Sequence, residues 1–264
     1  MFCGFNLKLK EQDILLIDHY YTVGKKLFDK QKKDIKSSLN KYVLEDESLD
    51  ESKIEEDWFP NVEANVFLSH SHKDEKLVIS FAGWLYETYR IKSFIDSCLW
   101  GYSDELLKLI DKNYCVLKRK ENGDIDTYNY DKRNRSTANV HLILSTALMK
   151  MIDNTETLIF INTPNSLNIV NDIQENYTSS PWIYNELLIS KVIRQKNLSE
   201  HRYKLGHSAT FSELEVRYEV KTNHLYDLSM NELRDLGIYN TTKDPYKTLD
   251  KLYKSKEILN GKQN

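Results

Sequence analysis

From about residue 64 onward, short apolar runs alternate with longer stretches in which apolar residues recur every three or four positions. Residues 65–69 and 92–96 are runs of strand length, and the stretch between them has helical spacing from Val78 to Tyr89. A strand, a helix and a second strand in this order form a right-handed crossover. The pattern therefore predicts an α/β fold with a mainly parallel sheet.

Toward the C-terminus the sequence predicts a charged segment and further helices and strands. Residues 118–135 are charged and contain Asn122-Gly123, a turn signal, which predicts a long surface loop or a hairpin. The other predicted elements are a short helix at 103–111, a possible strand at 114–117, a helix at 137–152, a central strand at 157–162, a helix at 180–195 and a half-exposed strand at 213–221.

The two ends of the chain have a different pattern. Residues 11–43 are helical in spacing, with Gly24 as a possible break, and an acidic run at 45–57 follows them. We expect residues 1–57 to be a helical extension and connector that serves as an interaction element. Residues 58–223 are then the α/β domain, and 224–264 a mixed helix and loop segment.

Composition and net charge argue against several classes of protein for this chain, among them nucleic-acid binders, membrane-spanning proteins and disulfide-rich proteins. The chain of 264 residues has a net charge of only -3, so it lacks the overall positive charge of a nucleic-acid or anionic-membrane binder. No apolar run is long enough to span a bilayer and no secretory signal is present, which predicts a cytoplasmic protein. Its three cysteines lack CxxC spacing, so neither a disulfide framework nor a zinc site is expected.

One helix carries an acidic residue among apolar neighbours. Ser180 is a favourable N-cap and Pro181 suits the first helical position. Trp182 and Glu186 then share one row of the helix with Ile189. A carboxylate there is partly desolvated, which is common for a functional acid, whereas the alternative is a boundary glutamate near a helix N-terminus.

The loop after the first predicted strand is a second candidate. Ser71 and Asp74 have capping-box spacing, so a helix should begin at the carboxyl end of the strand. Asp96 and Trp100 follow the next strand and should lie at the same edge, where open α/β sheets bind ligands. The same arrangement occurs in α/β folds without a ligand. His70 and His72 lack a third metal ligand, and the basic residues of 118–135 form either a solvated face or a phosphate contact.

Four stretches of the chain together resemble the Toll/interleukin receptor (TIR) domain, and they resemble bacterial TIR domains in particular. They are VFLSHSHKDE, SFIDSCLWG, STALMKMIDNTETLIFINTPNS and SPWIYNEL, within residues 64–221. The resemblance implies a flavodoxin-like doubly wound sheet. It also implies that Glu186, in a WxxxE arrangement with Trp182, matches the catalytic glutamate of the family.

Many bacterial and plant members of that family cleave NAD, and some produce ADP-ribose signals in anti-phage systems of the Thoeris kind. The resemblance thus implies an NAD glycohydrolase or ADP-ribosyl cyclase that uses NAD as substrate without another cofactor. It further implies a homo-oligomer on activation and a downstream effector that senses the product. The residues that would bind the substrate are Ser69, His70, Ser71, Asp96, Trp100 and Trp182.

Two other functions remain open at this point. A TIR adaptor would assemble partners without catalysis, and a nucleoside deoxyribosyltransferase-like enzyme shares the sheet type and a catalytic glutamate. Neither of the usual phosphate-binding motifs, GxxxxGK[ST] and GxGxxG, occurs in the chain. The N-terminal helices, the 118–135 segment and the C-terminal tail depart from a minimal TIR domain.

Overall fold

The computed structural model describes residues 1–45, 64–169, 176–178, 180–202, 218–219, 222, 224–237 and 243–258. Its main sheet has five strands in the order β10-β1-β6-β2-β3, and every neighbouring pair is parallel. The predicted α/β fold with a mainly parallel sheet is therefore confirmed. These strands are β1 (Cys3–Lys8), β2 (Val66–Ser69), β3 (Ser93–Ile95), β6 (Thr157–Asn162) and β10 (Tyr226–Ser229).

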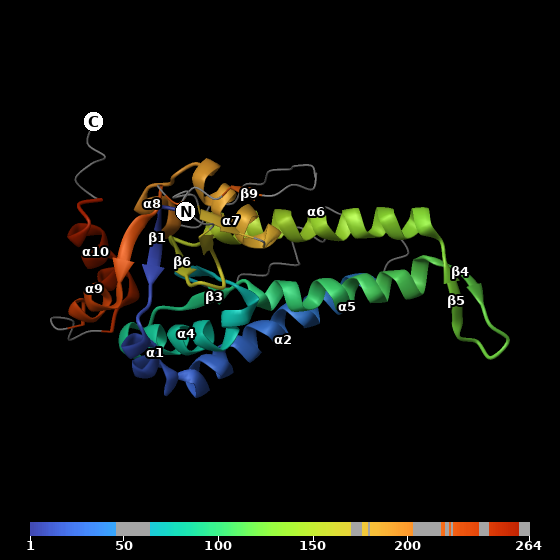
Figure 1. The fold of residues 1–264 in the computed structure, drawn as a ribbon, viewed down its shortest axis with the longest axis horizontal. Coiled ribbons are helices and arrows are strands. Elements are labelled where there is room, and N and C mark those ends of the chain that lie inside the picture. Colours follow the sequence, from blue (N-terminus) through green and yellow to red (C-terminus); the bar gives the residue numbers. More distant parts are fainter. Residues whose placement is uncertain are drawn as a thin grey trace.

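Helices cover both faces of this sheet (Figure 1). The helices α1 (Glu11–Asp18), α2 (Tyr21–Glu45) and α4 (Glu75–Tyr89) pack together on one face, and α6 (Tyr130–Asn154) and α7 (Pro181–Val192) lie on the other. Burial on both faces explains why β2 and β6 are nearly continuous apolar runs rather than alternating ones. The remaining helices are η1 (His72–Asp74), α5 (Ser97–Tyr114), α8 (Leu198–Arg202), α9 (Met230–Asp235) and α10 (Pro245–Ser255).

The N-terminal segment is not the purely helical extension that the sequence predicts. Its first strand, β1, lies between β10 and β6 and pairs with β6 from Cys3 to Lys8. Phe5 and Leu7 of this strand are fully buried. The expectation of a helical appendage is wrong at Cys3–Lys8, because these residues fill an interior position of the sheet.

The C-terminal segment also contributes to the sheet, since β10 is its edge strand beside β1. All three predicted segments thus share one sheet. Among strands after residue 64, the order β3-β2-β6 agrees with the first three positions of the flavodoxin-like order 2-1-3-4-5. The fourth position is occupied by β1 from the start of the chain.

Two helices extend beyond the sheet as a pair (Figure 1). At the far end of α5 and α6, a hairpin joins β4 (Val116–Arg119) to β5 (Ile125–Tyr128). The hairpin interpretation of 118–135 is confirmed as far as Tyr128, with Gly123 at a φ of 88° in its turn, whereas the residues from Tyr130 onward already belong to α6. The possible strand at 114–117 therefore belongs to a separate two-stranded sheet. Both helices are longer than predicted.

A third small sheet contains β7 (Asn168–Ile169), β8 (Asn176–Thr178) and β9 (Tyr218–Glu219). The predicted strand at 213–221 is confirmed at Tyr218–Glu219, and its other residues lie outside the described part of the chain. The acidic run after Glu45 is outside it as well. None of the helices in the described part is both long and apolar enough to cross a membrane.

Candidate functional site

The candidate site lies at the carboxyl ends of β2 and β6, where the direction of winding reverses. From β2 the chain proceeds to β3 on one side, whereas after β6 the next strand of the sheet is β10, on the other side. Loops that diverge in this way leave a crevice, and open α/β sheets bind ligands there. The predicted placement of His70 and Asp96 at one sheet edge follows from the parallel pairing of β2 with β3.

His70 and Asp96 form a buried ion pair at this edge. The imidazole Nδ1 lies 2.5 Å from the Asp96 Oδ1, and both side chains are almost fully buried. Burial alone would lower the pKa of His70, but the charge of Asp96 and its hydrogen bond outweigh burial. Glu75 and the Leu68 carbonyl act in the same direction, so the net effect is a raised His70 pKa.

Ser69 and Ser71, on either side of His70, are also buried. The Ser69 hydroxyl has no hydrogen-bond partner among the residues described here. The same holds for Ser97, which follows Asp96 and begins α5. Sequence reasoning missed Ser97, although its position directly after a predicted strand was a usable signal.

Asp74 makes contacts that differ from the predicted capping box. Ser71 makes no side-chain cap bond at the start of η1. The Asp74 carboxylate instead accepts hydrogen bonds from the Thr163 hydroxyl and, at 2.7 Å, from the Asn165 side-chain amide. The capping-box prediction is therefore wrong, because the Asp74 carboxylate is bonded to the loop after β6 instead. These bonds connect the loop after β6 to the segment after β2.

Glu186 lies on α7, whose start agrees with the sequence prediction. The Ser180 hydroxyl accepts a bond from the Ile183 amide at 3.3 Å, and Pro181 occupies the first helical position. Glu186 is 0% exposed. The sequence predicts a partly desolvated glutamate, whereas in the structure Glu186 is completely buried.

No protein-family model, curated protein or solved structure matches this chain.

The two predicted tryptophans lie in different settings. Trp182 is half-buried, and its ring stacks on that of His141, on α6, at 5.5 Å between centroids. Trp100 lies in the first turn of α5 rather than in a loop, because α5 already begins at Ser97. The structure therefore brings His70 and Asp96, which follow β2 and β3, into contact. Trp182 and Glu186 both lie on α7.

Two further polar groups near these elements were not predicted. Ser190, one turn after Glu186, is hydrogen-bonded to His224 Nε2 at 2.9 Å and donates to the Leu187 carbonyl. At the carboxyl edge, the Asn162 amide donates to the Asn6 side chain, which in turn donates to Asp227. These bonds connect strands that are distant in the sequence, so local pattern could not reveal them.

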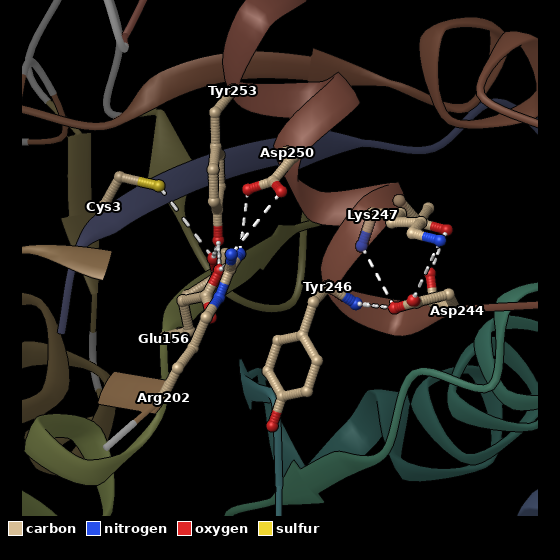
Figure 2. Close-up of polar contacts among 10 residues, drawn as sticks. Cys3, Glu156, Arg202, Asp244, Tyr246, Lys247, Asp250 and Tyr253 are labelled. Carbon is tan, nitrogen blue, oxygen red and sulfur yellow. Dashed lines mark hydrogen bonds and ion pairs between the residues drawn. The ribbon is translucent and has the colours of Figure 1, made fainter. Parts of the chain in front are cut away.

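Another buried glutamate, at the amino edge of the sheet, has a clear structural role (Figure 2). Glu156 immediately precedes β6 and binds the Arg202 guanidinium at 3.2 Å, and Arg202 also binds Asp250 of α10 at 2.8 Å. The Tyr253 hydroxyl donates to Glu156 at 2.9 Å. Burial raises the Glu156 pKa, and Arg202 opposes that rise. This cluster of ion pairs and hydrogen bonds connects α8 and α10 to the start of β6.

Within the described ranges, no group of three or more His, Cys, Asp or Glu side chains could hold a metal ion. The basic residues of the hairpin, Lys118, Arg119 and Lys120, lie at the far end of α5 and α6, and Arg133 near the start of α6 pairs with Asp111 at 2.9 Å. Their position favours the solvated-face interpretation over contact with a ligand at the sheet edge.

Proposed function

We propose that this protein is a TIR-like enzyme that cleaves NAD, with Glu186 as the catalytic glutamate. The observation that supports this most directly is the complete burial of the Glu186 carboxylate on a capped helix with the sequence SPWIYNEL. The carboxyl edge of a parallel sheet, at the point where the direction of winding reverses, suits a nucleotide substrate. In this proposal the sheet is flavodoxin-like, with β1 in its fourth position.

The chemistry needs only one carboxylate close to the ribose. Cleavage of the bond between the ribose C1′ and the cationic nicotinamide ring leaves an oxocarbenium-like centre on the ribose. A nearby negative charge stabilises that centre until water, or a nucleophile within the substrate, bonds to C1′. Because nicotinamide leaves as a neutral molecule, no general acid has to protonate it. His70, Asp96 and Ser69 would then hold the substrate at the sheet edge, and Trp182 would form the floor.

The wider biological role is part of the same proposal. Cleavage of NAD would yield an ADP-ribose-derived signal for a downstream effector in bacterial anti-phage defence. The enzyme would work in the cytoplasm and assemble into homo-oligomers on activation. Specific activity should therefore rise with protein concentration if neighbouring copies complete the site.

The decisive experiment compares nicotinamide release by the wild type and by Glu186→Gln over a wide range of protein concentrations. Glutamine retains the size of the side chain, so we expect stability to change by about 1 kcal/mol or less. Loss of the charge should lower turnover by about a hundredfold or more. Glu156→Gln is the matched control, since it removes a buried glutamate at the opposite edge and should leave turnover per folded molecule unchanged.

The possible results separate the alternatives. Robust nicotinamide release that is equal in wild type and Glu186→Gln would assign Glu186 a structural role and refute the site assignment. An adaptor would show no turnover at any concentration. A deoxyribosyltransferase-like enzyme would process deoxynucleosides and leave NAD intact.

A further inference from the structure

The hairpin of β4 and β5 forms a two-stranded sheet at the end of α5 and α6 that is remote from the main sheet (Figure 1). Apart from each other, the two strands mainly contact the end of α5. A two-stranded sheet on its own is at best marginally stable in water, and a third strand or a packed helix normally stabilises it. Each strand also has an outer row of backbone N–H and C=O groups that no other strand in the described part of the chain pairs with. The hairpin therefore has the features of a surface that binds another strand.

The base of the hairpin is held in a fixed orientation. The Asn129 amide donates to the Cys115 carbonyl at 2.8 Å across the open end of the hairpin. Arg133 of α6 pairs with Asp111 of α5 at 2.9 Å, and its guanidinium lies over the Tyr128 ring at 5.0 Å. These contacts attach the two strands to the two helices, so a second chain would meet a strand edge that is already formed.

The two strands carry opposite charges. Three basic residues lie on β4 and directly after it, and three acidic residues lie in the turn and along β5: Lys118, Arg119, Lys120, Glu121, Asp124 and Asp126. All six side chains are exposed. The hairpin as a whole is neutral, which argues against a nucleic acid or a uniformly acidic protein as its partner.

A second copy of the same hairpin complements these charges. When β4 of one copy runs antiparallel to β5 of the next, one register places Lys118 opposite Asp126. The same register places Lys120 opposite Asp124, because each step forward on one strand is a step back on the other. Residues two apart on a strand point to the same face, so both opposite-charge pairs form on one face of the joined sheet and stabilise it. The contact would also cover Leu117, which is 62% exposed on β4.

Pairing of like strands is unfavourable by the same reasoning. Two copies of β4 would place basic residues against basic residues, and two copies of β5 would place their aspartates side by side. Lysines on an edge strand commonly prevent such pairing. The acidic residues at the matching positions of β5 therefore select the contact of β4 with β5. Because this contact joins two different edges, each added copy leaves a further edge open.

We propose that the β4–β5 hairpin is the self-assembly surface of this protein, where β4 of one copy pairs with β5 of the next. Its role rests on the proposed function, in which copies assemble on activation, whereas its geometry follows from the hairpin itself. The assembly is head-to-tail, so it grows into rings or filaments rather than ending at a two-fold dimer.

The test is sedimentation velocity of the full-length protein over a wide range of concentrations, with a charge reversal on each strand. We expect the average mass of the wild type to rise continuously with concentration and to fall when salt screens the charges. Lys118→Glu and Asp126→Lys should each weaken assembly about tenfold, because an attractive pair becomes a repulsive one. An equimolar mixture of the two variants should assemble as the wild type does, since the reversed charges then meet each other across the contact. Lys30→Glu is the matched control, because it makes the same charge change at an exposed position of α2 and should leave assembly unchanged.

Each outcome decides for or against this surface. Assembly that each reversal weakens and the mixture restores would support it. A mixture that stays dispersed would overturn it, as would equal effects of Lys118→Glu and Lys30→Glu. A wild type that stays monomeric at every concentration would also overturn it, and the acidic run at 45–57 would then be the next occupant of β4 to test.

The same protein samples separate this proposal from the proposed function. If NAD cleavage depends on Glu186 while the hairpin variants assemble as the wild type does, the surface fails and the proposed function stands. If assembly depends on the hairpin but NAD is not cleaved at any concentration, the proposed function fails and the surface stands.

Discussion

At the scale of single residues, the buried contact between His70 and Asp96 joins the segments that follow β2 and β3. Each follows a predicted strand, so each could be placed at the carboxyl edge. The contact itself requires β2 and β3 to be neighbours in the observed register, which local pattern does not specify. Ser97 was missed for a related reason, because the turn expected after Asp96 is the first turn of a helix.

This pair should make stability depend on pH. The folded-state pKa of His70 is raised above its ordinary value of 6.5, so its contribution to stability is complete below that value. The contribution is lost as pH rises through the folded-state pKa. We therefore expect the free energy of unfolding of the wild type to fall, relative to His70→Gln, as pH increases above 6.5, measured by urea denaturation at a series of pH values.

A neighbouring histidine provides the control for this measurement. His72 is exposed, two residues away in the same loop. His72→Gln should follow the pH dependence of the wild type. A constant difference between wild type and His70→Gln at all pH values would contradict the assigned ion pair.

At the scale of secondary-structure elements, the contact of α2 with α4 explains a glycine that the sequence analysis misread. Gly24 was expected to separate two helices, but α1 ends at Asp18 and α2 continues from Tyr21 through Gly24. A Cβ at Gly24 would lie 1.8 Å from the Ile79 carbonyl oxygen, and one at Gly83 would lie 2.3 Å from the Tyr20 oxygen. Close helix packing, rather than a break, requires glycine here.

Substitution of this glycine should reverse the usual helix propensity. Alanine normally stabilises an exposed interior helix position by about 0.5–1 kcal/mol relative to glycine. Because backbone atoms of α4 block the Cβ, we expect Gly24→Ala to destabilise the protein by about 1–3 kcal/mol in chemical denaturation. Thr22→Ala, at an exposed position of the same helix, should change stability by less than about 0.5 kcal/mol. A stabilised Gly24→Ala would show that the two helices are farther apart.

The attachment of α10 offers a second test between elements. Arg202→Met leaves the buried Glu156 without its cationic partner, so we expect a loss of about 3–5 kcal/mol. Adding Glu156→Gln removes the uncompensated charge and should recover part of that loss. A double-mutant cycle with urea denaturation measures this coupling, and simple additivity of the two changes would contradict a direct ion pair.

At the scale of the whole molecule, the sheet is assembled from distant parts of the chain. β1 pairs with β6, about 150 residues later, and with β10, about 220 residues later. The sequence CGFNLK contains Gly4 and Asn6 and precedes a helical pattern, so no local signal indicated a strand. Within the main sheet, the strands that were predicted are β2, β3 and β6, each of which contains adjacent large apolar residues and no glycine.

This arrangement makes the first residues of the chain essential to the core. Phe5 is fully buried and lies near two aromatic rings of the C-terminal segment, at 6.1 Å from Tyr226 and 6.4 Å from Tyr253 between centroids. Phe5→Ala should therefore lower the free energy of unfolding by about 3–5 kcal/mol. Leu15→Ala is the control in the same segment, because Leu15 is 77% exposed, and its effect should stay within about 0.5 kcal/mol.

The same comparison distinguishes an integral strand from a separate appendage. If β1 belongs to the sheet, Phe5→Ala shifts one cooperative transition that tyrosine and tryptophan fluorescence and circular dichroism report alike. An appendage would instead leave the main transition unchanged. A wild-type midpoint in Phe5→Ala, with Leu15→Ala behaving identically, would contradict the interior position of β1 and restore the helical-extension interpretation.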